Sequence, residues 1–202
     1  MRLIISCLLA VLLAGCTGGL PAPQRTPRST STAAISTSAT PTAPRTGPLT
    51  TGPNVRPGEQ PPQYPADARK HDVAGALDFA VYYTAVLDWS AATNDTVLLE
   101  QISASDCVAC ARDIEAAKQL HRNHETELGG RSRLLRARVV HGKFAISSEQ
   151  VVETTTSDEN IVIVSSSGQR TTVAPAVSKR VSYVFVSWRD DRWLVVGEGA
   201  PS

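Results

Sequence analysis

Helical spacing of apolar residues gives way to strand patterning within one short stretch, Leu128-Gly129-Gly130-Arg131-Ser132-Arg133-Leu134-Leu135-Arg136-Ala137-Arg138-Val139-Val140-His141. Adjacent glycines are typical of a helix end, because glycine adopts the left-handed conformation there at little steric cost. The residues that follow place Arg136 and Arg138 on one face of a strand, and Ala137 and Val139 on the other. We therefore expect helices before the glycines and strands after them.

Three helices are expected on the N-terminal side of this boundary. Asp72 is a suitable N-cap for the first, in which apolar residues recur at helical spacing and cover more than one face. Ser105 or Asp106 is the expected N-cap of the third, which Gly129-Gly130 would close. The expected helices span residues 73–94, 96–102 and 107–128.

Segments rich in Val, Ile, Thr and aromatic residues follow, and these compositions predict strands. The expected strands span residues 133–141, 149–156, 160–165, 181–188 and 193–196. Asp190-Asp191 lies between the last two and predicts a hairpin. Helices followed by an antiparallel sheet indicate the α+β class.

The chain begins like the precursor of a lipoprotein. Arg2 precedes about a dozen apolar residues, which is the build of a secretory signal and is shorter than the about 20 residues that span a bilayer. The run ends in Leu13-Ala14-Gly15-Cys16, which resembles the lipobox of bacterial lipoproteins. We expect cleavage of residues 1–15 and attachment of acyl chains such as palmitate to Cys16, which would hold the protein on the extracytoplasmic face of the cell membrane. The alternative is an ordinary signal peptide with a chance cysteine.

A low-complexity segment follows the presumed cleavage site. Residues 17–66 contain 11 of the 13 prolines and ten threonines, with few large apolar side chains. Such a composition cannot offset the entropy of ordering, so residues 16–66 are expected to form a disordered tether and residues 67–202 one domain. Residues 67–202 carry 15 basic and 18 acidic side chains, which argues against nucleic acid as a partner.

Several segments resemble one uncharacterised family, a domain of unknown function found in actinobacterial lipoproteins. The resemblance rests on Tyr64–Arg69, on Gly75–Tyr83 and on Ser103–Cys110, whose Asp-Cys-x-x-Cys element is the most specific part. It continues through Gly129-Gly130 and is looser over the strands. That family is similar to the nuclear transport factor 2-like cone, in which a curved sheet wraps a long N-terminal helix around a cavity. The resemblance implies a fold and a location, and no chemistry.

Cys107 and Cys110 form the sharpest motif. Residues three apart in the first turn of a helix have Cα atoms roughly 5–6 Å apart, within disulfide range, and disulfides persist in an oxidising compartment. We expect a structural disulfide. The alternative is a thioredoxin-like redox pair, since a helix N-terminus lowers a thiol pKa, but that motif expects a βαβ setting that the sequence does not provide.

No metal or cofactor is expected. His121 and His124 follow the cysteines, but Cys110 and His121 would lie roughly 16 Å apart along one helix, too far for a shared zinc. A basic series is expected on a solvated face of the sheet, with anionic lipid or a cell-wall polymer as the alternative partner. It comprises Arg131, Arg133, Arg136, Arg138, His141 and Lys143.

Four residues are candidates to line a cavity in such a cone: Tyr82, Tyr83, Asp88 and His141. They match no catalytic motif, and the chain has no nucleophile elbow and no phosphate-binding glycine loop. We therefore expect a non-catalytic binding or interaction module of the cell envelope. Its partners would be an envelope protein, a small apolar ligand or a second copy in a homodimer. The alternatives are a thiol–disulfide enzyme and a small cavity enzyme of isomerase or cyclase type.

Overall fold

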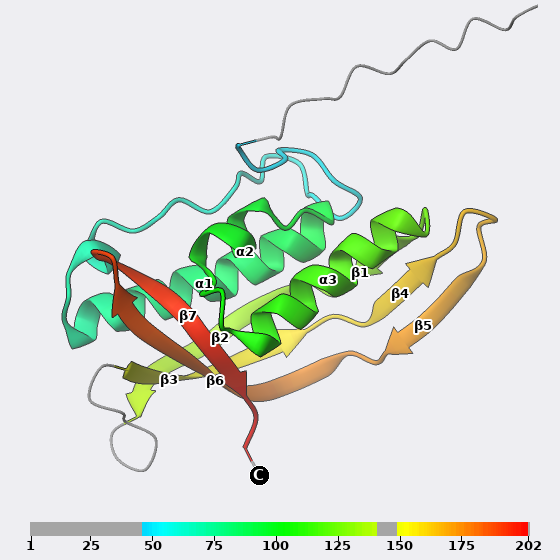
Figure 1. Cartoon of the computed structure of the whole chain (residues 1–202). Helices are drawn as coiled ribbons and strands as arrows, with labels where there is room; N and C mark the ends of the chain where they lie inside the picture. Colours follow the sequence, from blue (N-terminus) through cyan, green and yellow to red (C-terminus); the bar gives the residue numbers. More distant parts are fainter. Residues whose placement is uncertain (1–45, 141–148, 202) are drawn as a thin grey trace, which may run out of the picture. The chain divides into compact units, whose positions relative to one another are not determined.

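The computed structural model describes residues 46–140 and 149–201 and shows a mixed α+β architecture (Figure 1). A short 3-10 helix, Asp67–Arg69, precedes three α-helices: α1 (Val73–Thr93), α2 (Val97–Ile102) and α3 (Val108–Arg122). The strands are β1 (Thr126–Gly129), β2 (Ser132–Val140), β3 (Glu149–Asp158), β4 (Ile161–Val164), β5 (Arg170–Ala174), β6 (Val177–Arg189) and β7 (Arg192–Gly199). The predicted α+β class is confirmed.

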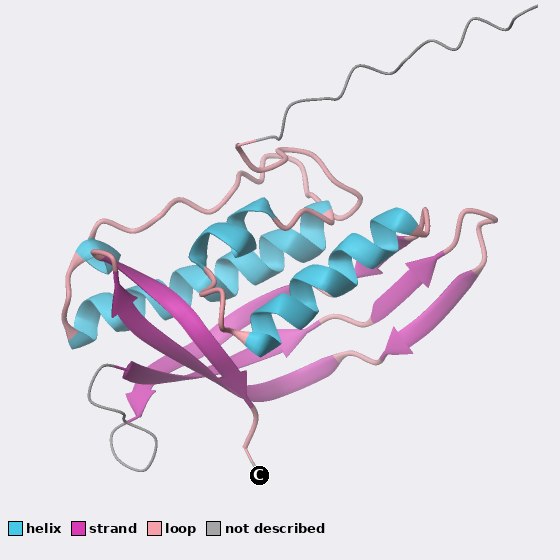
Figure 2. Ribbon diagram, in the orientation of Figure 1, coloured by secondary structure: helices cyan, strands magenta, loops and turns pink. Residues whose placement is uncertain are grey.

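The strands form two antiparallel sheets. One has the order β2-β3-β6-β7 and the other the order β1-β4-β5. Figure 2 shows the helices on one face of the four-stranded sheet, so the structure has a helical layer and a sheet layer. The hairpin predicted at Asp190-Asp191 joins β6 to β7, and both aspartates take positive φ, 50° and 58°.

Helix α1 is the centre of the fold. The Asp72 side chain caps it by accepting a hydrogen bond from the Gly75 amide at 2.7 Å, and Asn94 ends it in the left-handed conformation. Phe79 and Val86 are at most 1% exposed and belong to the same apolar core as Val152 and Val186 of the sheet. The predicted first and second helices are confirmed.

The third helix differs from its prediction at both ends. Its N-cap is Cys107, whose sulfur accepts a hydrogen bond from the Cys110 amide at 3.2 Å, and not Ser105 or Asp106. It ends at Arg122 because His124 takes a positive φ of 55° and the chain then pairs as β1 with β4. Gly129 and Gly130 therefore turn the chain from β1 into β2, at φ 73° and 68°, and do not close a helix.

All five predicted strands are found near their expected positions, mostly longer than predicted. Two strands were not predicted, β1 and β5. β1 continues the sequence of a helical pattern, and β5 carries an exposed Thr-Thr-Val run, Thr171–Val173, with no buried face to give it an alternating pattern.

Residues 46–66, here called the strap, were assigned to the disordered tether, and the structure corrects this. The Asn54 side chain donates to the carbonyls of Ala91 and Glu127 at 2.8 and 3.0 Å and accepts from the Gly129 amide at 3.0 Å. Trp89 donates its indole N–H to the carbonyl of Leu49 at 3.1 Å. Polar side-chain and backbone hydrogen bonds hold the strap in place. These contacts need few apolar residues, so the amino-acid composition of the strap wrongly predicts disorder. The packed region therefore includes residues from 46 onward, and the predicted signal peptide, Cys16 and the predicted tether up to residue 45 lie outside the described residues.

Candidate functional site

A cavity of about 420 Å³ lies between α1, α3 and the helix-facing side of the sheet. Hydroxyl side chains make up much of its wall: Thr84, Ser132, Thr154, Thr156 and Ser182. Its charged lining residues are Arg112, Asp158, Arg180 and Glu198. This volume lies within the roughly 300–1,000 Å³ of small-molecule sites. The mixture of hydroxyl groups and charges suits a ligand with polar groups.

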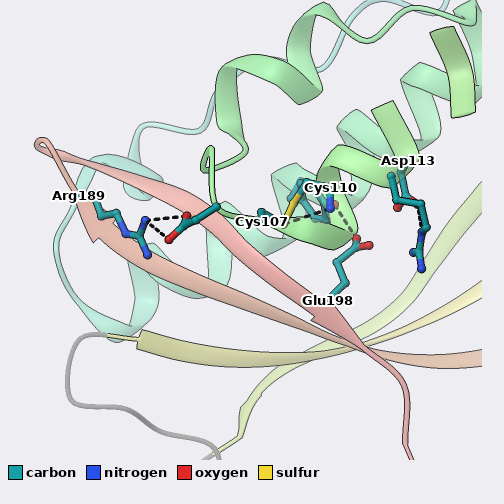
Figure 3. The surroundings of a disulfide bond; sticks show 8 residues. Cys107, Cys110, Asp113, Arg189 and Glu198 are labelled. Atoms are coloured by element: carbon teal, nitrogen blue, oxygen red, sulfur yellow. Dashed lines mark hydrogen bonds and ion pairs between the residues drawn. A yellow bond between two sulfur atoms is a disulfide. The ribbon is translucent and has the colours of Figure 1, made fainter. Parts of the chain in front are cut away.

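Glu198 is placed in this cavity by β7, and Figure 3 shows its side chain directed from that strand toward α3. The hydroxyl of Tyr83, a residue only 1% exposed, donates to Glu198 Oε1 at 2.6 Å. Burial of the Glu198 carboxyl group is the largest influence on its pKa and raises it. The hydrogen bond from Tyr83 opposes this rise, and the nearby Asp113 adds to it. Burial also raises the pKa of Tyr83, so the phenol stays protonated and remains a donor.

Asp113 of α3 extends this network. Its carboxyl group lies near Glu198 and adds to the rise in the pKa of Glu198. On its other side Asp113 Oδ1 accepts from Arg112 Nε at 3.0 Å. Glu198 and Arg112 line the cavity, with Tyr83 and Asp113 beside them, and the pKa of Glu198 is raised in this setting.

Asp158 also lines this cavity, but its pKa is shifted in the opposite direction to that of Glu198. Burial works against its ionisation, but hydrogen bonds from Arg180, Thr156 and Ser132 outweigh burial and hold the pKa of Asp158 below its ordinary value. The Ser132 hydroxyl donates to it at 2.8 Å, and Arg180 forms an ion pair with it. One cavity thus contains a carboxyl that favours the protonated form and a carboxylate that favours the ionised form.

The disulfide lies beside this network, at the start of α3 (Figure 3). The Cα atoms of Cys107 and Cys110 are 5.3 Å apart, and their side chains are 1% and 2% exposed. The predicted proximity of the two cysteines is confirmed. The neighbouring Asp106 accepts two hydrogen bonds from Arg189 Nη1, at 2.9 and 3.0 Å, which ties the same turn to β6. The bond therefore fixes the turn from which α3 carries Arg112 and Asp113 to the cavity.

The four residues predicted to line a cavity are not brought together. Tyr83 reaches the cavity through Glu198, but Tyr82 packs in the core, its ring 5.1 Å from that of Tyr64. Asp88 borders a different hollow of about 520 Å³, where it is held by Arg131. His141 lies outside the described residues. A hydropathy pattern places tyrosines in a helix but does not tell which one meets a polar partner from a distant strand.

Arg131 corrects the prediction of a fully solvated basic series. It is 7% exposed and donates to both oxygens of Asp88, at 2.9 and 2.6 Å, and to both oxygens of Glu59, at 3.0 and 3.2 Å. The hydrogen bond to Asp88 is the main reason that the pKa of Arg131 is raised further. This residue ties α1, β2 and the strap together. The other described members of the series, Arg133, Arg136 and Arg138, are exposed, while His141 and Lys143 lie outside the described residues.

The central site residues, Glu198, Asp113 and Asp158, were not singled out from the sequence. Glu198 carried a usable signal, since it is an acidic residue between two glycines in an otherwise apolar strand, Val195-Val196-Gly197-Glu198-Gly199. Asp113 and Asp158 look like ordinary surface aspartates in their local sequence. Within residues 46–140 and 149–201, no three His, Cys, Asp or Glu side chains are grouped so that they could hold a metal ion. In the same ranges, no helix is both long and apolar enough to cross a membrane.

Comparison with known proteins gives distant structural similarities. The intermembrane space region of the chloroplast protein ARC6 is 12% identical, with a TM-score of 0.49, over 66% of this chain and 98% of that one. A protein of Xanthomonas campestris assigned as a calcium/calmodulin dependent protein kinase II association domain is 10% identical, with a TM-score of 0.33, over 65% of this chain and 87% of that one. A protein of Novosphingobium aromaticivorans assigned as an aromatic ring hydroxylase is 15% identical, with a TM-score of 0.37, over 67% and 89%. At these scores the similarities carry no conclusion about function.

No curated protein matches the chain. A family model does match, and it covers residues 56–199, from the strap to the end of the last strand. That range includes the disulfide, the Arg131 ion pairs and every residue of the cavity network. The chain therefore belongs to the family of unknown function DUF6318.

Proposed function

We propose that this protein is a lipoprotein of the cell envelope, anchored through Cys16 on the extracytoplasmic face of the membrane, whose domain binds a small ligand in the cavity that Glu198 borders. The Leu-Ala-Gly-Cys ending of the N-terminal apolar run supports the anchor. A helical layer over an antiparallel sheet with a cavity between them supports a nuclear transport factor 2-like cone. The function is binding, and the ligand enters from outside the cell membrane.

The observation that carries this proposal is the half-buried Glu198, which lines a 420 Å³ cavity and is held by the buried Tyr83 with Asp113 nearby. Removing a carboxyl group from water costs free energy. Carboxyl groups with shifted pKa values in a cavity are therefore candidates for a binding or catalytic site. A protonated Glu198 can donate a hydrogen bond to an acceptor on the ligand, and the hydroxyl groups around it can accept or donate further ones.

The test is an inventory of small molecules bound to the protein purified from its own cells. Ser182 lines the cavity, so Ser182→Phe fills it, while Ser178→Phe adds the same ring at an exposed position of the same strand, outside the lining. After equal folding has been checked by circular dichroism, both variants and the wild type are extracted and the extracts analysed by mass spectrometry. We expect one species to accompany the wild type and Ser178→Phe but not Ser182→Phe. Equal occupancy in all three, or an empty wild type, would refute the cavity as a binding site.

A second candidate is a small cavity enzyme of isomerase or cyclase type. The specific observation that favours it is the pair of carboxyl groups with opposite pKa shifts, Glu198 raised and Asp158 lowered, because such a pair divides the roles of acid and base. Incubating the extracted species with fresh protein separates the two candidates. A binding module returns it unchanged, whereas an enzyme converts it and loses that conversion in Glu198→Gln.

The redox alternative finds no support in the geometry. Catalytic cysteines are partly exposed so that a substrate disulfide can reach them, and both cysteines here are at most 2% exposed. A structural disulfide is the better proposal for this pair.

A further inference from the structure

The face of the four-stranded sheet that points away from the helices carries a cluster of basic side chains. The strand register places Arg133 opposite Ser157, Arg136 opposite Thr155, and Arg138 opposite Glu153. Their partners on the other face, such as Val139 opposite Val152 and Ala137 opposite Thr154, belong to the core or the cavity. The three arginines are exposed, and so is Lys179 of β6. We call these four residues and Glu153 the basic face.

The contacts of Glu153 show that the cations of the basic face lie close to one another. Arg138 donates to both of its oxygens, at 2.7 and 2.6 Å. The hydrogen bond from Arg138 comes first among the influences that lower the pKa of Glu153, and the charges of Arg136 and Lys179 also contribute. One carboxylate is therefore surrounded by three cations, and with Arg133 the basic face has a net charge of +3. The folded region as a whole is mildly acidic, so this concentration of positive charge is local.

An exposed apolar side chain, Leu135, lies beside these cations on β2, the edge strand of the sheet. The pairing of β2 with β3 shifts between Leu134 and Arg136, and the bulge leaves Leu135 without a partner residue and 46% exposed. Leu135 also borders a shallow groove of about 340 Å³ whose other walls include Leu77 and Val81 of α1. Tyr183 of β6 lies opposite Glu153 in the strand register, and it also contributes to the wall of the cavity.

We propose that the basic face docks the domain onto the anionic phospholipid surface of the membrane. Guanidinium and ammonium groups bind phosphate headgroups, while Leu135 enters the boundary between headgroups and acyl chains. This inference rests on the proposed anchor at Cys16, because a tethered domain meets the bilayer at high effective concentration. Docking through this face leaves the cavity, on the opposite side of the sheet, facing away from the lipid.

The exposed leucine distinguishes a bilayer from a soluble polyanion. A charged polymer such as a cell-wall glycan phosphate offers nothing for an apolar side chain to enter, whereas a lipid interface does. The bulge leaves Leu135 exposed on β2, next to the exposed Arg136 and two residues from the exposed Arg133. Cations beside an exposed leucine match a lipid surface in both charge and polarity.

The experiment uses the mature chain from residue 17, which lacks the lipid and keeps every described residue. Its binding is measured by co-sedimentation with phosphatidylcholine vesicles, with and without phosphatidylglycerol. We expect binding only to the anionic vesicles and its loss in high salt. At roughly fivefold per cation, Arg136→Gln with Lys179→Gln should weaken binding on the order of 25-fold. Glu153→Gln, which removes the one carboxylate of the face, should strengthen it.

The matched control is Lys118→Gln with Arg122→Gln, which removes the same charge from α3 on the helical side and should leave vesicle binding nearly unchanged. Leu135→Ala should weaken binding to vesicles several-fold and leave binding to dextran sulfate in solution unchanged. If both double variants lose the same amount of vesicle binding, net charge alone explains the effect and the proposal is overturned. Tight binding to dextran sulfate, together with a Leu135→Ala variant that still binds vesicles like the wild type, would replace the membrane with a soluble polymer. Ser182→Phe should bind vesicles normally, so an empty cavity and a failed docking face are separate results.

Discussion

Glu198 illustrates how a single side chain acquires a chemical role from its surroundings. Its strand neighbours are glycines and valines, and its functional partners, Tyr83 and Asp113, come from two helices more than 80 residues earlier in the sequence. Only the packing of α1 and α3 on the sheet brings these groups together. Local sequence therefore marks Glu198 as unusual without indicating what it contacts.

The raised pKa of Glu198 predicts a pH dependence of stability. A carboxyl that binds its proton more tightly in the folded state stabilises the fold fully below the unfolded pKa, near 4.5, and loses that contribution as pH rises through the folded pKa. Glutamine at position 198 keeps a neutral acceptor for Tyr83 and does not titrate. We expect Glu198→Gln to lose less stability than the wild type on going from pH 4.5 to pH 8, measured by urea unfolding. The half-buried Glu127, whose pKa is also raised, is present in both proteins, so its contribution cancels in the comparison. Parallel curves for the two proteins would contradict the raised pKa of Glu198.

Arg131 gives a second prediction at this scale. Arg131→Gln leaves Asp88 without its cation and Glu59 with Arg56 alone, 3.7 Å away, and breaking a fully buried pair costs about 3–5 kcal/mol. The two carboxylate side chains keep 20% and 25% exposure, so we expect a smaller loss of about 2–3 kcal/mol in the free energy of unfolding. Arg133→Gln, two residues along and exposed, should change it by less than about 0.5 kcal/mol. Similar values for the two variants would show that the Arg131 ion pairs do not stabilise the fold.

At the scale of the elements, the strap was wrongly predicted from its composition, whereas helix α1 was correctly predicted from its apolar periodicity. Helix α1 has a repeating apolar pattern and an N-cap, and both were legible in the sequence. The strap has prolines, threonines and glycines, the composition of a disordered chain, yet Asn54 and Gly52 fit it closely against the C-terminal end of α1. Contacts made by backbone groups and one amide side chain leave no hydrophobic signature. The end of α3 was misplaced for a related reason, because the partner of β1 lies far along the chain.

Gly52 tests the packing of the strap. A Cβ at this position would lie 2.3 Å from the Cα of Thr93 and 2.5 Å from the carbonyl oxygen of Ala92, both in the backbone of α1. We expect Gly52→Ala to lower the free energy of unfolding by about 1–3 kcal/mol, the usual cost of overpacking. Gly47→Ala, where nothing lies within 4 Å, is the control and should have little effect. If thermal unfolding of the two variants coincides, the strap does not pack as described.

The disulfide is predicted to stabilise and not to catalyse. It closes a loop of only four residues, for which the chain-entropy model gives about 2 kcal/mol. Replacing both cysteines with serine should therefore lower stability by about that amount while the fold, seen by circular dichroism, persists. In the native protein both thiols should resist alkylation until it is unfolded and reduced. Insulin reductase activity that disappears in Cys107→Ser would instead promote a redox role.

At the scale of the whole molecule, the order of helices and strands was enough to predict the α+β class, because periodicity reports local structure reliably when the segments are long. The division into two sheets, the cavity and its charged residues could not be predicted, since each depends on pairings between distant strands. Arg131 is the clearest case. It lies in the same basic stretch as Arg133 and Arg136, and only the fold shows that it is buried between two carboxylates while they face solvent.

The proposed ligand cavity and the proposed docking face lie on opposite sides of one sheet, and this arrangement suits a domain held at a membrane surface. Acylation of Cys16 is the claim on which the docking proposal depends, and the most direct measurement is incorporation of labelled palmitate in the native host, with fractionation of the cells. We predict that the wild type is labelled and sediments with membranes, and that Cys16→Ser carries no label. A Cys16→Ser protein that is still labelled and still sediments with membranes would contradict the account.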